Sequence, residues 1–133
     1  MEDSIFNKII KGEIPCHKVY EDEHTLAFLD IHPAMPGLTL VVPKKQVGFV
    51  WDMDSADYQA LMLTVQKVGQ RLREVLPEYD RVGVHVEGLD ISDHAHVKVF
   101  PFDTHVDFTR HADMEVEPDH QALSKMAELL HFS

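Results

Sequence analysis

The chain carries three side chains able to do chemistry close together, at His94, His96 and Lys98. Side chains two residues apart share one face of a β-strand, so these three are expected to form a row, each about 6.6 Å from the next. The residues between them are apolar and would face the other side. Because a row of polar groups is costly to bury without partners, we expect it to face an anion, a metal ion or solvent.

The residue types leave three interpretations open. The row can be a polar strand face in water. It can be a metal site, because two histidines in alternation are common ligands and Asp93, Asp90 or His85 would add a third, although Lys98 would repel a divalent cation. It can also hold a nucleophile, since a neutral imidazole attacks phosphorus to give a P–N bond that water later hydrolyses. Neighbouring cations would then balance the phosphoryl charge.

The stretch from His94 to Phe100, followed by Pro101, resembles the signature of the histidine-triad (HIT) family, in which three histidines alternate with apolar residues. Further blocks follow in the family's order, namely 4–15, 19–23, 27–33 and 36–44. The resemblance therefore covers roughly Ser4 to Pro101. The short loop 88–93 that runs into His-Ala-His is similar to a bacterial branch of the family.

The resemblance implies a HIT-like α+β fold, with an antiparallel sheet of about five strands, a long helix and short flanking helices. It also implies a nucleotide-binding hydrolase or transferase that cleaves a nucleoside monophosphate from a leaving group. In that reaction His96 would attack the α-phosphorus, His94 would help to hold the site and its ligand, and Lys98 would neutralise phosphate charge. The mechanism requires no metal or cofactor.

By position, the resemblance also implies a set of nucleotide-binding residues: Ile5, Phe6, Ile9, Asp30, Ile31, Leu40 and Ser92. A carboxylate suits the ribose, because Asp30 would accept hydrogen bonds from two neighbouring hydroxyls. Plain core packing explains the apolar side chains of 5–9 equally well, and turn capping explains Asp30. Ser92 would steer a leaving group or simply cap its loop. The expected ligand is a purine nucleotide or nucleotide conjugate, and the expected assembly is a homodimer.

Three departures from the family pattern bear on catalysis. Lys98 replaces the third histidine and cannot accept a proton or hydrogen bond as imidazole does. Leu38 and Gln46 stand where the family commonly has histidines. These losses keep open an alternative function, a nucleotide-binding protein without catalysis. Among the other histidines, His32 and His85 are the two expected nearest the ligand.

Composition sets outer limits on the function. The 133 residues include 12 basic and 23 acidic side chains, for a net charge of −11. Such acidity disfavours duplex nucleic acid and anionic membranes as partners, and the apolar runs are too short to cross a bilayer. The acidic start at Met1 is unlike a signal peptide. A lone Cys16 excludes an internal disulfide and suits the cytoplasm, which is the expected location.

The elements that would position these residues form one predicted domain, 1–133, with a family-like core at about 4–101. Ser4 is the expected N-cap of a short helix that ends near Gly12. Strands are expected over 17–21, 25–31, 38–42, 81–86 and 94–100. An apolar stripe predicts a helix over 55–76, which would also suit contact between two copies. A helix over about 118–131 ends a C-terminal extension, and 103–117 has no assignment.

Overall fold

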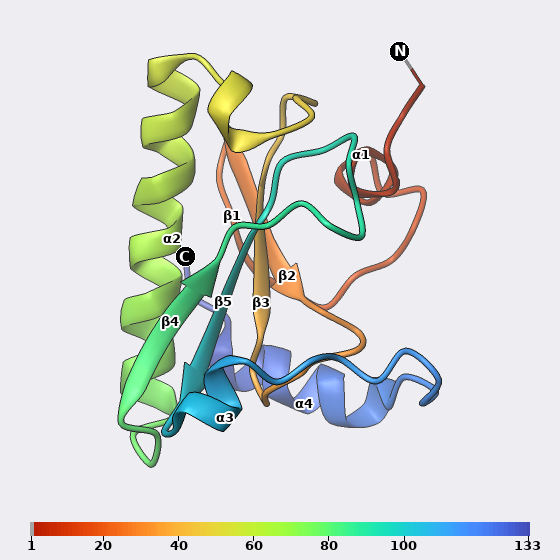
Figure 1. The fold of residues 1–133 in the computed structure, drawn as a ribbon. Helices are drawn as coiled ribbons and strands as arrows, with labels where there is room; N and C mark the ends of the chain where they lie inside the picture. Colours follow the sequence, from red (N-terminus) through yellow and green to blue (C-terminus); the bar gives the residue numbers. More distant parts are fainter. Residues whose placement is uncertain (1) are drawn as a thin grey trace.

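The computed structural model describes residues 2–133 and contains one five-stranded sheet (Figure 1). The strands are β1 (Lys18–Glu21), β2 (Thr25–Leu29), β3 (Thr39–Pro43), β4 (Arg81–His85) and β5 (Val97–Phe102). They are ordered β1-β2-β3-β5-β4, and every neighbouring pair is antiparallel. The predicted α+β class and five-stranded antiparallel sheet are confirmed.

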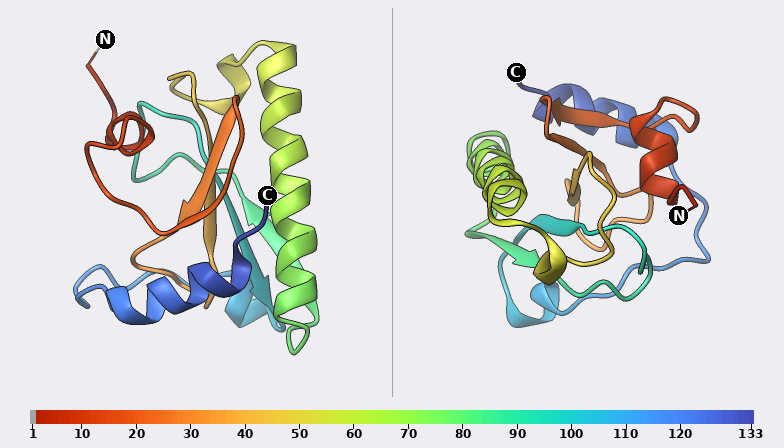
Figure 2. Two further views of the ribbon diagram at one scale, coloured as in Figure 1. Left: turned by 180° about the vertical axis from the view of Figure 1, so that it is seen from behind. Right: turned by 90° about the horizontal axis from the view of Figure 1, so that it is seen from above.

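One face of the sheet is covered along its length by helix α2 (Ser55–Val75) (Figures 1 and 2). Asp54 caps this helix by accepting a hydrogen bond from the backbone N–H of Asp57 at 2.9 Å. The predicted stripe is the buried face, and Leu61, Val65, Val68 and Leu72 pack with Val41, Val97 and Val99 in the larger core. The hydrophobic periodicity of the sequence therefore places α2 on the side of the sheet occupied by these valines.

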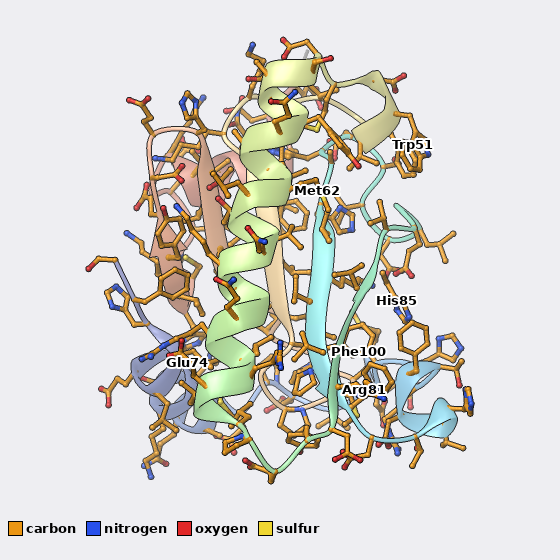
Figure 3. The ribbon with its side chains drawn as sticks, turned by 90° about the vertical axis from the view of Figure 1, so that its left-hand side faces the viewer. Trp51, Met62, Glu74, Arg81, His85 and Phe100 are labelled. Atoms are coloured by element: carbon orange, nitrogen blue, oxygen red, sulfur yellow. The ribbon has the colours of Figure 1, made fainter. Side chains whose placement is uncertain are left out.

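The opposite face of the sheet carries a smaller core and the short helices α1 (Ile5–Ile10) and α3 (His105–Phe108). This core is built from Phe6, Leu26, Phe28, Met35, Leu38, Leu40, Val42 and Phe100. Figure 3 shows α2 lying along the sheet, with His85 projecting from β4 on the side away from that helix. The polar residues of the predicted site belong to this second face.

The C-terminal helix α4 (His120–Leu130) packs against β1, β2 and α2. Its N-cap is Asp119, so the helix begins two residues after the predicted Pro118. Arg71 of α2 donates hydrogen bonds to the backbone carbonyls of Leu129, Leu130 and His131. These bonds satisfy carbonyl groups that a helix C-terminus leaves without partners.

Several predicted boundaries differ from the structure. The strand predicted over 94–100 begins at Val97, so the two histidines precede it. The strands predicted over 25–31 and 81–86 end early, at Leu29 and His85. The unassigned segment contains α3, capped by Thr104, and residues 109–117 follow without regular helix or strand. Among the described residues, no helix combines the length and hydropathy required to cross a membrane.

Candidate active site

His94 is completely buried and uses both ring nitrogens within the protein. Its Nε2 lies 2.7 Å from the carbonyl oxygen of Pro43, and its Nδ1 lies 2.6 Å from Oγ of Ser4. A carbonyl oxygen can only accept, so Nε2 carries the proton and the Ser4 hydroxyl donates to Nδ1. Burial lowers the pKa of His94, which keeps the ring neutral. The side chain of His94 is therefore a buried structural group.

Ser4 connects this histidine to the start of α1. Its Oγ accepts a hydrogen bond from the backbone N–H of Asn7 at 2.9 Å, which is the predicted N-cap contact. Gln46 accepts a hydrogen bond from the backbone N–H of Ser4 at 3.2 Å. Gln46 stands in a region where the family commonly has a histidine. Through this bond it helps to hold the N-terminal segment next to the site.

His96 is held in one tautomer by the chain immediately before it. Its Nδ1 lies 3.0 Å from the backbone carbonyl oxygen of His94, so Nδ1 carries the proton and Nε2 keeps its lone pair in the neutral ring. Phe6 packs edge-on against both imidazoles, with ring centroids 5.2 Å from His96 and 5.8 Å from His94. His96 is 5% exposed, so the interpretation of this row as a polar face in water is wrong for both histidines.

Lys98 lies on β5 with its ammonium group held by carboxylates. Its Nζ is 2.5 Å from Oε1 of Glu87 and 3.9 Å from Oδ2 of Asp90. The hydrogen bond from Lys98 is the main reason why the pKa of Glu87 is lowered, so Glu87 is ionised at neutral pH. The cation in the third triad position is therefore already paired before any phosphate arrives.

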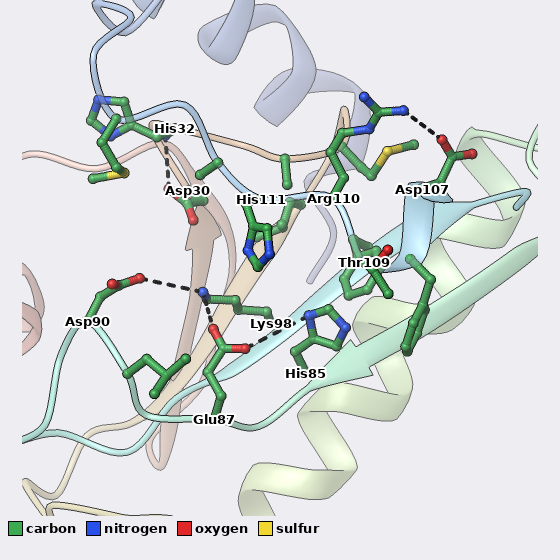
Figure 4. A pocket seen from close by; sticks show the side chains of 18 residues that line it. Asp30, His32, His85, Glu87, Asp90, Lys98, Asp107, Thr109, Arg110 and His111 are labelled. Atoms are coloured by element: carbon green, nitrogen blue, oxygen red, sulfur yellow. Dashed lines mark hydrogen bonds and ion pairs between the residues drawn. The ribbon is translucent and has the colours of Figure 1, made fainter. Parts of the chain in front are cut away.

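A cavity of about 480 Å³ opens beside Lys98 on the second face of the sheet (Figure 4). Of the predicted site residues, Asp30 and Lys98 line it. His32 and His85, the two histidines expected near a ligand, also line it, as does Leu38. The far wall comes from the segment 107–114, which begins within α3 and includes Arg110 and His111. His94 and His96 are not among the described residues that line this space, although His96 precedes Lys98 by two positions.

Asp30 lies just after β2, where it turns the chain. Its carboxylate accepts a hydrogen bond from the backbone N–H of His32 at 2.9 Å, as the turn-capping interpretation expects. Burial raises the pKa of Asp30, and this effect is opposed by the His32 hydrogen bond and by the charge of Lys98. A carboxylate that lines the cavity and is poorly solvated is well placed to accept hydrogen bonds from a ligand.

The remaining predicted nucleotide-binding residues have different environments. Phe6 and Leu40 are buried in the smaller core, and Ile9 packs against that core. Ile5 and Ile31 are exposed, as is Ser92 in the loop before His94. Asp30 is thus the predicted nucleotide-binding residue that lines the cavity.

Sequence reasoning missed Glu87, the carboxylate 2.5 Å from Lys98, and the wall formed by residues 107–114. Glu87 lies in the strand-to-loop junction, and neither its spacing nor its type identifies a partner. Arg110 and His111 lie in a segment without periodicity. Within residues 2–133, no group of three or more His, Cys, Asp or Glu side chains is arranged to hold a metal ion.

Comparison with known proteins identifies the family. The HIT domain model matches residues 11–106. The chain belongs to the HIT domain family. An uncharacterised HIT-like protein of Methanocaldococcus jannaschii is 41% identical over 100 residues, covering 73% of this chain and 77% of that protein. Protein hit of Bacillus subtilis is 40% identical over 84 residues, covering 63% of this chain and 56% of that relative.

Solved HIT structures share the fold across most of the chain. A HIT-like protein from Bartonella henselae has a TM-score of 0.81 at 28% identity, covering 96% of this chain and 94% of that one. A HIT family hydrolase from Legionella pneumophila has a TM-score of 0.66 at 25% identity, covering 77% and 95%. The family model ends at residue 106, so residues 107–114 of the cavity wall lie outside the matched HIT domain.

Proposed function

We propose that this HIT protein is a nucleotide-binding hydrolase or transferase that cleaves a nucleoside monophosphate from a leaving group. The observation that carries the proposal is the contact of His96 Nδ1 with the backbone carbonyl of His94, 3.0 Å away. That contact fixes the proton on Nδ1 and leaves the Nε2 lone pair for attack on phosphorus. The reaction would proceed through a nucleotidyl-histidine at His96.

The other groups have roles that follow from their chemistry. His94 positions the nucleophile through its carbonyl, while its buried ring is anchored by Ser4 and Pro43. Lys98 supplies a cation for the phosphoryl oxygens through N–H groups that its contact with Glu87 leaves free. Asp30 accepts hydrogen bonds from the ribose hydroxyls. The apolar side chains of α1 and Ile31 bind a purine base.

A second function, nucleotide binding without turnover, is favoured by one specific observation. Leu38 is a buried apolar residue that lines the cavity where the family commonly has a histidine. Because Leu38 is apolar and Lys98 is paired with Glu87, the site has fewer free polar groups that could stabilise a transition state. On this alternative the pocket binds a nucleotide and His96 does not react.

Steady-state turnover separates the two functions. We expect the wild type to release AMP from an adenosine phosphoramidate, and both His96→Ala and His96→Asn to be inactive while keeping their thermal unfolding transitions. Binding of AMP is measured in parallel by calorimetry. Nucleotide binding without turnover by the wild type would establish the alternative function, and undiminished turnover by folded His96 variants would exclude His96 as nucleophile.

The proposal extends to assembly and location. Within residues 2–133, β4 pairs with β5 alone and forms an edge of the sheet. Val84 on this strand is 41% exposed, an apolar side chain at an open edge. We infer that two copies associate through β4 and α2 as a homodimer. The single free Cys16 fits a reducing, cytoplasmic location.

A further inference from the structure

His85 is an imidazole that the proposed reaction has not yet used. It is directly opposite Lys98 in the β4–β5 pairing and lines the same cavity. Its ring is packed between Phe100 of β5 and Phe108 of α3, with both centroids 4.7 Å away. Its side chain remains 29% exposed. The ring is therefore held in place and still accessible from the cavity.

Glu87 links His85 to Lys98. One carboxylate oxygen, Oε1, contacts the Lys98 ammonium at 2.5 Å, and the other, Oε2, lies 4.0 Å from Nδ1 of His85 (Figure 4). The first contact holds Glu87 ionised and in place. The second places a carboxylate oxygen on the Nδ1 side of the His85 ring. Lys98, Glu87 and His85 therefore lie next to one another along the cavity wall.

A transfer reaction sets the spacing that His85 and His96 would need. An attacking nitrogen begins about 3–3.5 Å from phosphorus, and an acid donates to the departing atom over about 2.6–3.2 Å. With the breaking bond between them, nucleophile and acid must lie about 7–8 Å apart. His96 immediately precedes β5, Lys98 is the second residue of that strand, and His85 is opposite Lys98 on β4.

We propose that His85 is the general acid that protonates the leaving group, with Glu87 as its positioning residue. This inference rests on the proposed function. Nε2 of His96 forms a bond to the α-phosphorus as the bond to the leaving atom breaks. The leaving atom takes the electron pair of that bond and the proton of His85. In the second step neutral His85 takes a proton from water, whose oxygen displaces His96 and releases the nucleoside monophosphate.

The replacement of the third triad histidine by Lys98 gives a physical reason for a general acid at another position. Lysine cannot pass a proton to the leaving group and recover it from water as readily as imidazole does near neutral pH. The cross-strand neighbour supplies the imidazole that the third triad position lacks. His111 also lines the cavity, from the opposite wall, and provides the comparison that tests the assignment.

Two substrates with the same adenylyl half and different leaving groups distinguish acid catalysis from structural support. An adenosine phosphoramidate of an aliphatic amine requires protonation of its leaving nitrogen, whereas adenosine 5′-(p-nitrophenyl phosphate) releases a stable anion. We expect His85→Gln to lower kcat/KM at least ~100-fold for the first substrate and to change the second by less than about threefold. Glu87→Gln should act in the same direction, by about tenfold.

The controls keep the inference separate from the proposed function. His105→Gln changes an exposed histidine of α3 and should leave both substrates unaffected. His85→Asn repeats the test if His85→Gln unfolds. Equal losses on both substrates, no loss, or a selective loss in His111→Gln instead would overturn the role of His85 while leaving His96 as nucleophile. Failure of the wild type to turn over either substrate would remove the proposed function and this inference with it.

Discussion

At the scale of single residues, the site depends on a relay of hydrogen bonds from the N-terminus to His96, the proposed nucleophile. Ser4 fixes the ring of His94, and the backbone of His94 fixes the ring of His96. In our proposal His94 acts through its main chain, and the ligand-holding role that the resemblance implied for its side chain stays a prediction. The proposal therefore accounts for a fully buried histidine in the family's motif.

Removing the Ser4 hydroxyl should destabilise the protein. Ser4→Ala leaves the buried Nδ1 of His94 without a donor and also removes the cap of α1, so we expect the free energy of unfolding to fall by about 1–3 kcal/mol. Urea denaturation measures the change. Ser124→Ala, at an exposed serine of α4, should alter it by less than about 0.5 kcal/mol. Equal stability of the two variants would contradict the relay.

We expect Asp30 to lower the stability of the fold and to strengthen nucleotide binding. Its folded-state pKa is raised by burial above the ordinary 3.8, so its ionisation opposes folding as pH rises through that range. Asp30→Asn keeps an acceptor for the His32 N–H, and we expect it to raise Tm at neutral pH and to match the wild type below the ordinary carboxyl pKa. Its affinity for AMP should fall about tenfold, because the ribose loses a charged acceptor. A lower Tm at neutral pH would refute the burial argument.

At the scale of elements, patterns with a strong local cause were predictable and long-range contacts were not. The stripe of α2 follows from the spacing of its apolar residues, and it is present in the structure. The start of β5 was placed too early, because alternation alone cannot show that His94 bonds to Pro43 and Ser4. The position of α3 was not predictable either, because it depends on Phe108 packing over Gly83. A side chain at position 83 would not fit there, since its Cβ would come within 2.8 Å of the Phe108 ring.

The contact between α2 and α4 can be tested at Arg71. This side chain donates to three carbonyl oxygens at the end of α4, so Arg71→Ala should lower the free energy of unfolding by about 1–3 kcal/mol. Hydrogen exchange should increase selectively in α4. Arg73→Ala, two residues away and exposed, is the matched control and should change neither quantity. Unchanged exchange in the Arg71 variant would mean that apolar packing alone holds the helix.

At the scale of the whole molecule, the family fold was predictable because ordered blocks of residues agree over most of the chain. The cavity was only partly predictable. Asp30 and Lys98 were expected in the site, whereas Glu87 and the wall at 107–114 come from segments whose positions depend on strand pairing and on the packing of α3. His96, the proposed nucleophile, was identified from a motif, whereas its hydrogen bond to the carbonyl oxygen of His94 required coordinates.

The proposed homodimer makes a prediction at this same scale. We expect the wild type to sediment as a dimer and Val84→Lys to sediment as a monomer, because a charge at the centre of the open β4 edge would be buried on association. Val106→Lys, at an exposed valine of α3, should remain dimeric. A monomeric wild type, or a dimeric Val84 variant, would place the interface elsewhere or remove it.

The central claim is that His96 forms a covalent bond to the nucleotide. Its most direct test is rapid-quench mass spectrometry of the protein mixed with an adenosine phosphoramidate, followed by mapping of the modified peptide. The account predicts a transient mass increase of one adenylyl group on His96, absent from His96→Asn. Product formation by the wild type with no adduct at any quench time, or an adduct on another residue, would contradict it.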